Sequence, residues 1–395
     1  MTLRGWCKMK YEMVKLSDVG KIITGNTPSK KNSEYYDDGN IPFIKPNNFI
    51  RDSISNLFES DEYLSISGSE AARMVNEGTV LVTCIGTIGN VGIASKKICF
   101  NQQINAIEPD NTKINSRYLA YTILKYKKQL KAIANAPVVP IINKTQFSLF
   151  EIPLPPLETQ EKIVEVLDKA QALIDARKEQ IRLMDELIQA QFIEMFGDPV
   201  INPKGWKTGY IGDITEKTQY GTSKKANEIK GNYPIIRMNN ITYSGGWDLR
   251  NIKYIDLNDN ELDKYLVFKG DLLFNRTNSK ELVGKTAIFR EEVPMAFAGY
   301  LVKLRTNEKG NTEYISAYLN SIQGKSVLFN MAKSIVGMAN INAEELKKIK
   351  INIPPVSLQN DFAFIVENIE NQKRKLEQSL IEYELNYKVI MNSIF

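Results

Sequence analysis

Apolar residues recur at alternating steps of four and three along two long stretches of the chain. In the first stretch the recurring positions are Ile163, Leu167, Ala170, Ile174, Arg177, Ile181, Met184, Ile188, Gln191 and Met195. In the second, in the same phase, they are Phe362, Val366, Ile369, Lys373, Leu376, Leu380, Tyr383, Tyr387, Ile390 and Ile394. Spacing of this kind over about five heptads predicts two long helices with coiled-coil seams.

Proline and glycine mark where these helices begin and end. A Pro-Pro pair at 155–156 and another at 354–355 precede the two stretches, and proline is excluded from a helix interior. The sequence Gly197-Asp198-Pro199 ends the first helix, whereas the second runs to the last residue. The polar seam residues Arg177, Gln191 and Lys373 either set the pairing register or extend their polar ends to solvent, and the pattern leaves both open.

The second half of the chain repeats the first about 195 residues later. GNIPFIK at 39–45 is echoed by GNYPIIR at 231–237, and each copy then reaches an Asn-Asn pair. EGTVL at 77–81 is echoed by KGDLL at 269–273, and IPLPPL at 152–157 by INIPPV at 351–356. We therefore predict the order globular, helical, globular, helical over residues 1–152, 153–198, 199–352 and 353–395.

The predicted fold class is α+β. Two mixed α/β domains are separated by two long helices that form an antiparallel coiled coil, with pseudo-two-fold symmetry. Within the globular copies, 79–85 and 272–274 read as buried strands, and 117–131 and 314–329 have helical periodicity. A helix of about 37 residues would be about 55 Å long, which is on the order of one to two turns of a DNA duplex. The copies would then contact two half-sites separated by a spacer that neither contacts.

Composition removes several classes of chemistry. The chain has no histidine, which excludes Ser-His and Cys-His catalytic pairs. Its three cysteines show no CxxC spacing, which disfavours a zinc site, and no apolar run reaches the roughly 20 residues that span a bilayer. We expect a cytoplasmic protein with no catalytic residue and no metal site. Both globular copies are net basic and both helical regions net acidic, which favours two contacts with phosphate.

Three groups of polar residues are candidates for contact with DNA. Adjacent lysines beside small hydroxyl residues suit phosphate contacts: Lys30, Lys31, Lys224 and Lys225. Side chains that bond adenine or guanine edges stand at the end of the GNIPFIK and GNYPIIR segments and just after them: Lys45, Asn47, Asn48, Arg237, Asn239 and Asn240. The loops beyond the buried strands add Thr87, Asn90, Gln102, Gln103, Asn275, Arg276, Thr277, Asn278 and Lys280. The alternatives are solvated surface lysines and asparagines that only form turns.

Taken together, these features resemble the specificity (S) subunit of Type I restriction-modification systems. The resemblance rests on the tandem organisation, on PLPPLETQEKIVEVLDKAQALID at 153–175, and on FNRTNSKELVGKTAIF at 274–289 and IGTIGNVGIA with NQQINAI in the first copy. It implies two target-recognition domains that recognise a bipartite, asymmetric DNA sequence. It also implies assembly with two modification (methyltransferase) and two restriction (translocase) subunits. S-adenosylmethionine, ATP and magnesium would belong to those partners, with no cofactor on this chain.

Two other classes of function are weighed against this one. A free-standing modification enzyme or nuclease would need an Asn-Pro-Pro-Tyr-like motif, a P-loop or a nuclease motif, and the sequence shows none of them. A structural protein that uses its coiled coil for association would show no sequence preference in a DNA-binding selection. The C-terminal copy reads SLQN where the first reads ETQE, which leaves open whether both helices contact the methyltransferases equally.

Overall fold

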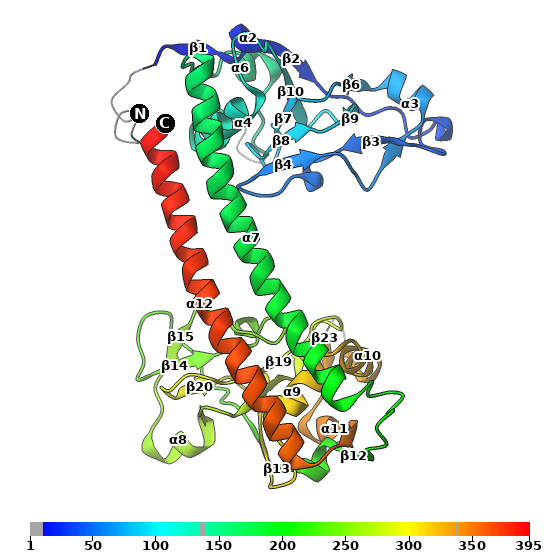
Figure 1. Cartoon of the computed structure of the whole chain (residues 1–395), viewed down its shortest axis with the longest axis vertical. Coiled ribbons are helices and arrows are strands. Elements are labelled where there is room, and N and C mark those ends of the chain that lie inside the picture. The colour runs from blue at the N-terminus through cyan, green and yellow to red at the C-terminus, as the bar shows by residue number, and fades with distance from the viewer. Residues whose placement is uncertain (1–10, 135–138, 336–337) are drawn as a thin grey trace. The chain divides into compact units, whose positions relative to one another are not determined.

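The structure is a computed structural model that describes residues 11–134, 139–335 and 338–395. It divides into two compact units. We call residues up to Ala176 together with Leu380–Phe395 the first unit, and Arg177–Ser379 the second unit. Two long helices, α7 (Leu157–Phe196) and α12 (Val356–Ile394), each contribute to both units (Figure 1). Both begin directly after their Pro-Pro pair, as predicted.

Among its described residues, the first unit contains three sheets. The small one pairs β1 (Met13–Lys15) with β11 (Glu151–Pro153). A five-stranded sheet has the order β2 (Gly20–Thr24), β10 (Ile104–Pro109), β7 (Val80–Thr83), β8 (Val91–Ala94) and β4 (Ile54–Leu57). A four-stranded sheet has the order β5 (Tyr63–Leu64), β3 (Ile41–Ile44), β9 (Ile98–Phe100) and β6 (Arg73–Val75).

The second unit repeats this arrangement, except that among its described residues the larger sheet has no counterpart of β4. A two-stranded sheet pairs β12 (Lys207–Tyr210) with β24 (Lys350–Ile353). One four-stranded sheet has the order β13 (Thr215–Tyr220), β21 (Leu301–Thr306), β17 (Leu272–Asn275) and β19 (Thr286–Ile288). The other has the order β15 (Lys253–Ile255), β14 (Tyr233–Ile236), β20 (Met295–Phe297) and β16 (Leu266–Val267). An additional sheet has the order β18 (Thr277–Asn278), β23 (Met338–Asn340) and β22 (Lys333–Ile335). The internal repeat seen in the sequence is therefore a repeat of topology.

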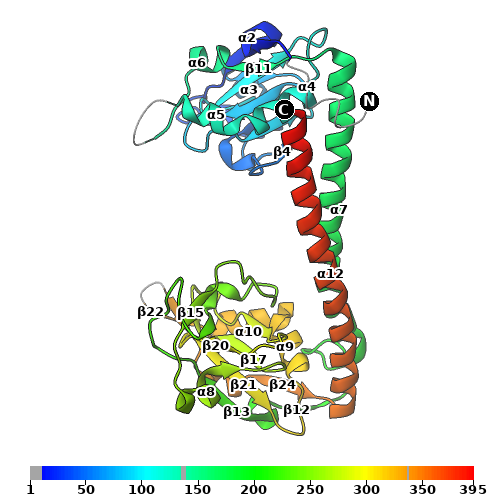
Figure 2. The same cartoon turned by 90° about the vertical axis from the view of Figure 1, so that its left-hand side faces the viewer.

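The central strands are buried on both faces. In β7, Val80 and Val82 belong to the core beneath the helices, whereas Leu81 faces the core shared with the four-stranded sheet. In β17, Leu272 lies in the core that includes α9 (Thr312–Asn320), which packs on this sheet (Figure 2), and Leu273 faces the opposite core. Successive side chains of a strand point to opposite faces, so burial on both sides requires a continuous apolar run.

Shorter helices complete each unit. The first unit has α2 (Leu16–Val19), α3 (Ile66–Ala71), α4 (Ser116–Lys125), α5 (Lys127–Ala132) and α6 (Lys144–Ser148). The second has α8 (Asp259–Tyr265), α9, α10 (Ile322–Met331) and α11 (Ala343–Lys347). The helices predicted over 117–131 and 314–329 are therefore each two helices, with breaks at Tyr126 and Ser321. Ser321 ends the first of its pair because its hydroxyl accepts a hydrogen bond from the Gly324 amide and caps α10.

The coiled-coil seam is confirmed, with a local shift at one end. All twenty predicted seam positions are buried or half-buried. In the first unit, Ile163 near the start of α7 shares a core with Ile394 at the end of α12. In the second, Phe192 near the end of α7 lies 5.8 Å from Phe362 near the start of α12, between ring centroids. Each unit thus pairs the start of one long helix with the end of the other, so the two run antiparallel.

Two of the polar seam residues, Lys373 and Gln191, make different contacts. Lys373 is 7% exposed and forms an ion pair with Asp185 on the facing helix, so it does not extend to solvent. Gln191 instead donates a hydrogen bond to Glu194 of its own helix, at 3.1 Å. Phe192, which is fully buried, contributes to the core at this level. Phe192 takes the core position in place of Gln191 because its aromatic ring removes more apolar surface from water.

A buried glutamine joins each long helix to its globular domain. Gln160 in the first turn of α7 donates to the carbonyls of Lys113 and Pro155 at 2.9 and 2.8 Å, and it accepts from the Asn115 amide at 2.8 Å. Gln359 in α12 makes the same three hydrogen bonds in the second unit, to Lys309, Pro354 and Asn311. The glutamines that the sequence places after each Pro-Pro pair are therefore structural clamps.

Candidate nucleic-acid interface

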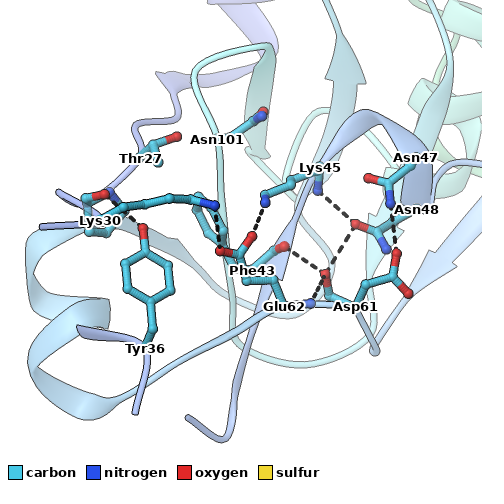
Figure 3. A network of polar contacts seen from close by, with 12 residues as sticks. Thr27, Lys30, Tyr36, Phe43, Lys45, Asn47, Asn48, Asp61, Glu62 and Asn101 are labelled. Carbon is cyan, nitrogen blue, oxygen red and sulfur yellow. Dashed lines mark hydrogen bonds and ion pairs between the residues drawn. The ribbon is translucent and has the colours of Figure 1, made fainter. Parts of the chain in front are cut away.

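Two of the three predicted lysines of the first unit meet at one carboxylate. Lys30 and Lys45 both form ion pairs with Glu62, Lys30 at 3.4 Å (Figure 3). Lys30 is largely exposed, while Lys45 follows β3 and lies over the Phe43 ring. Burial and the neighbouring Lys30 ammonium lower the pKa of Lys45. One acidic side chain therefore holds two cations at a surface that has the chemistry to contact phosphate.

The Asn-Asn pair beside them divides its roles. Asn47 is exposed and donates to Asp61 at 2.7 Å. The Asn48 side chain turns back, and its Oδ1 accepts hydrogen bonds from the Lys45 amide at 2.8 Å and from the Ser60 hydroxyl at 3.2 Å. Asn48 thereby closes the 3-10 turn η2 (Pro46–Asn48), which is the turn-forming role weighed as the alternative.

The second unit builds the same turn. Asn240 is 3% exposed; it accepts from the Arg237 amide at 2.9 Å and donates to the Asp248 carbonyl at 2.8 Å. This closes η4 (Met238–Asn240) and leaves Asn239 exposed. One Nη of Arg237 donates to the Asn251 carbonyl at 2.8 Å, and its buried Nε has no partner in the described part of the chain.

The remaining candidates of the first unit lie in two loops. Thr87 and Gln102 are exposed, and Gln102 accepts a hydrogen bond from the Thr27 hydroxyl at 2.5 Å. Gln103 is half-buried, and its side-chain oxygen accepts a hydrogen bond from the Asn101 side-chain amide at 2.9 Å. Asn90 is 8% exposed and accepts from the Lys127 ammonium at 2.8 Å, so it supports the loop from inside.

In the second unit, the lysine pair and the loop after β17 carry the candidates. Lys31 of the first unit and Lys225 are exposed, and the structure gives their ammonium groups no ion pair among the described residues. Lys224 pairs with Glu261 at 2.5 Å. Lys280 is exposed, with its ammonium 4.3 Å from the centre of the Phe329 ring. Asn278 is half-buried, and its side chain accepts from the Ser279 amide at 2.9 Å.

The other three candidates were expected in that loop, but Asn275 ends β17 and Thr277 begins β18, and all three face inward or lie against a ring. Asn275 is fully buried and Thr277 is 7% exposed. Arg276 is half-buried, and its guanidinium carbon lies 5.0 Å from the centre of the Tyr220 ring. Arg276 forms no ion pair with any residue that the structure describes.

Several residues near these candidates escaped sequence reasoning. Glu62 neutralises the predicted Lys45. Asp61 accepts a hydrogen bond from the predicted Asn47, and neither acid is close to its partner in sequence. Lys285 is 7% exposed and donates to the Met238 and Ile241 carbonyls at 2.8 and 2.5 Å, so it braces the η4 turn. No local signal marks them, because each is defined by a partner at least 14 residues away.

Lys325 is a further cation that sequence reasoning missed. Its ammonium is buried without a hydrogen-bond partner among the described residues and lies 4.6 Å from the Tyr243 ring centre. Burial and the nearby Lys285 ammonium lower the pKa of Lys325 to about 8.

Other features bear on alternative sites. Burial raises the pKa of the Cys84 and Cys99 thiols to about 12, which keeps both in the unreactive thiol form. Within residues 11–134, 139–335 and 338–395, no cluster of three or more cysteine, aspartate and glutamate side chains is arranged to hold a metal ion. None of the helices there combines the length and the apolarity that crossing a bilayer requires.

Comparison with known proteins decides the family. The family model described as "Type I restriction modification DNA specificity domain" matches residues 8–183 and 203–386, which together make up most of the chain. The chain belongs to this family. Each match spans one globular copy and most of the helix that follows it, so the family's repeating module is the repeat found in the sequence. The resemblance to Type I specificity subunits is thereby confirmed.

Relatives of this family match over different lengths. The EcoKI specificity subunit of Escherichia coli (strain K12) is 23% identical over 382 residues, covering 90% of this chain and 81% of the relative. The HindI specificity subunit of Haemophilus influenzae is 36% identical over 176 residues, covering 42% of this chain and 36% of the relative. The crystal structure of a Type I S subunit from M. genitalium matches 98% of this chain and 96% of that one, with a TM-score of 0.61 and 12% identity. This last likeness shows that the fold is shared.

Proposed function

We propose that this chain is the DNA-specificity subunit of a Type I restriction-modification complex. Each globular copy recognises one half of a bipartite, asymmetric target. The single observation that carries this is the repeated sheet topology with dissimilar side chains on it. The equivalent turns share an exposed asparagine, Asn47 or Asn239, but the first unit has Lys45 where the second has Arg237. Related frames with different polar groups suit two different short sequences.

The chain is proposed to do no chemistry itself. Methyl transfer, ATP-driven translocation and cleavage would belong to partner subunits, together with S-adenosylmethionine, ATP and magnesium. The sequence has no histidine, and Cys84 and Cys99 are buried, which argues against Cys-His and Ser-His catalysis by this chain. Methyl transfer by the purified chain without partners would contradict this assignment.

Exposed apolar stripes on the long helices support the proposed methyltransferase partners. Ile381, Leu385 and Val389 follow one another at steps of four on α12 and are 67%, 60% and 58% exposed. On α7, Leu183 and Leu187 are 45% and 41% exposed, also at a step of four. Residues four apart share a helix face, and a row of exposed apolar side chains is typical of a surface that binds another helix. We infer that helices of two methyltransferase subunits dock here.

The docking proposal is tested with a matched pair of variants in the co-expressed complex. Leu385→Asp is expected to lower the methyltransferase content of the purified complex from two copies to one, because it places a charge in the apolar contact on α12 and leaves the α7 stripe intact. Asn386→Asp, which adds the same charge at the neighbouring exposed position, should leave co-purification intact. Equal losses in both variants, or loss in neither, would place the contact elsewhere.

The recognition proposal is tested by methylome sequencing of cells that express this chain with its methyltransferase partner. The expected result is a bipartite methylated motif with a gap of fixed length. Replacing residues 1–152 by the corresponding segment of another family member should change one half-site, and replacing 199–352 should change the other. A continuous motif, or a swap that alters both half-sites, would contradict modular recognition. Association without any sequence preference would favour the alternative, a structural coiled-coil protein.

A further inference from the structure

Four buried polar atoms near the start of β18 have no hydrogen-bond partner in the described part of the chain. They are Asn275 Nδ2, Arg276 Nε, Thr277 Oγ1 and Asn340 Oδ1. Asn275 is fully buried, and Thr277 and Asn340 are register partners in the β18–β23 pair. Native proteins rarely leave such groups unpaired, because each loses the hydrogen bonds that water would supply. Arg276 is the one charged side chain of this set, and leaving a charged group without a partner is the most costly case.

The first unit contains the same backbone frame. There the Cys84 amide donates to the Gln103 carbonyl at 2.8 Å, and the Ile142 amide donates to the Cys84 carbonyl at 2.9 Å. In the second unit the Arg276 amide donates to the Tyr300 carbonyl at 3.0 Å, and the Ile341 amide donates to the Arg276 carbonyl at 2.9 Å. Arg276 therefore stands where the first unit has a buried cysteine.

The neighbouring positions of this frame are also apolar or satisfied in the first unit. The pair Thr277 and Asn340 corresponds to the bridge between Ile85 and Ile141. Asn275 corresponds to Thr83, whose hydroxyl donates to the Thr87 carbonyl and accepts from the Asn90 amide. The frame thus folds without unpaired polar atoms in one copy. The polar set of the second copy is not required by the fold, so its presence calls for another cause.

Arg276 is held in a fixed orientation but is not neutralised. Its guanidinium lies against the Tyr220 ring, and the Tyr220 hydroxyl accepts a hydrogen bond from the Ala343 amide at 3.0 Å. Two other arginines of this unit, Arg290 and Arg305, each form a bidentate pair with a carboxylate. For Arg276 the described residues provide no such acceptor. A stacked guanidinium with free donors is pre-organised for a planar ligand that offers two acceptors.

We propose that Arg276 is a specificity-determining residue that contacts guanine in the half-site of the second unit, and that Tyr220 is its positioning residue. Guanine offers O6 and N7 side by side in the major groove, which matches the two parallel donors of an arginine. The inference rests on the proposed function. Because Cys84 occupies the corresponding place and is 2% exposed, the first unit has no such contact and recognises its half-site through other side chains.

The test uses the full chain co-expressed with its methyltransferase partner and a library of duplexes randomised over both half-sites. The wild-type motif is expected to contain a G·C pair in one half-site, namely the half-site that changes when residues 199–352 are swapped between family members. Arg276→Ala should lower discrimination at that one position by roughly ten- to hundredfold and leave the other half-site unchanged. Arg276→Lys should also lower discrimination at that position, because lysine keeps the charge but lacks the two parallel N–H donors of the guanidinium.

The role of Tyr220 is tested by rescue. Tyr220→Ala should relax the same G·C position as Arg276→Ala, whereas Tyr220→Phe, which keeps the ring, should restore it. Arg250→Ala is the charge control, since Arg250 lies in the same unit, is exposed and pairs with Asp248. It should leave discrimination at every position unchanged. Thermal melting of each variant reports folding separately from recognition.

Three outcomes would overturn the proposal. The first is a half-site without a G·C pair. The second is an unchanged motif in both Arg276 variants. The third is a loss of affinity that is uniform across sequences, which would mark Arg276 as a phosphate contact. In each case a bipartite motif would still stand, so failure of this inference is distinguishable from failure of the proposed function.

Discussion

The glutamine clamp offers a sharp test of how each long helix is fixed to its domain. Gln160 is fully buried and makes three hydrogen bonds with backbone groups of the first unit. Gln160→Ala removes all three and leaves the Asn115 amide without its partner. At roughly 1 kcal/mol for each lost bond, we expect the free energy of unfolding of this unit to fall by about 3 kcal/mol. For a unit of this size that corresponds to a drop in Tm of roughly 6–12 °C.

A second substitution at this site adds a pH signature. Gln160→Glu keeps the shape but places a carboxylate against the Lys113 and Pro155 carbonyl oxygens. Burial and these oxygens would raise the pKa of the introduced carboxyl above its value in the unfolded chain. The variant should therefore be most stable relative to wild type below about pH 4, where the group is protonated in both states. It should lose stability as the pH rises through the folded-state pKa.

The assay is thermal unfolding combined with hydrogen exchange followed by mass spectrometry. Exchange should accelerate around α4 in Gln160→Ala and around α9 in the matched variant Gln359→Ala, because each glutamine clamps its own unit. Gln180→Ala, at an exposed position of the same helix, is the control and should behave as wild type. The reasoning would be refuted by faster exchange in the opposite unit, or by Gln160→Glu melting at the wild-type temperature at neutral pH.

Three further outcomes are expected. Lys373→Ala should destabilise the second unit by about 3 kcal/mol in urea unfolding, while the double change Lys373→Met with Asp185→Leu should restore most of the loss, since an apolar pair replaces the buried ion pair; no recovery would argue against this. Asn240→Ala should cost about 1–3 kcal/mol without altering any single base preference, because it frees the Arg237 amide and breaks the η4 turn; a change confined to one base would show direct contact instead. Glu62→Gln should tighten non-specific duplex binding and steepen its salt dependence by roughly one to two released counterions, measured by fluorescence anisotropy; an unchanged slope would place these lysines away from the phosphates.

The organisation of this protein could be predicted from the sequence because its signals are local and repeated. The four-three spacing recurs through each long helix, and each Pro-Pro pair excludes a helix interior, so both starts were predicted correctly. The apolar run in β7 predicts burial on both faces without any knowledge of its neighbours. The duplication doubles every such signal, because two copies with the same topology place equivalent residues at equivalent turns.

Roles of individual polar residues were decided only by tertiary contacts. The sequence offers Asn47 and Asn48 as equals, yet one faces solvent and the other closes a turn. Glu62 lies 17 residues from the lysine that it neutralises, and Gln160 reaches a carbonyl 47 residues away. A hydrogen bond depends on the position of both partners, and chain periodicity specifies only one of them. The pattern therefore determined which elements form, and packing determined which polar groups remain free to contact DNA.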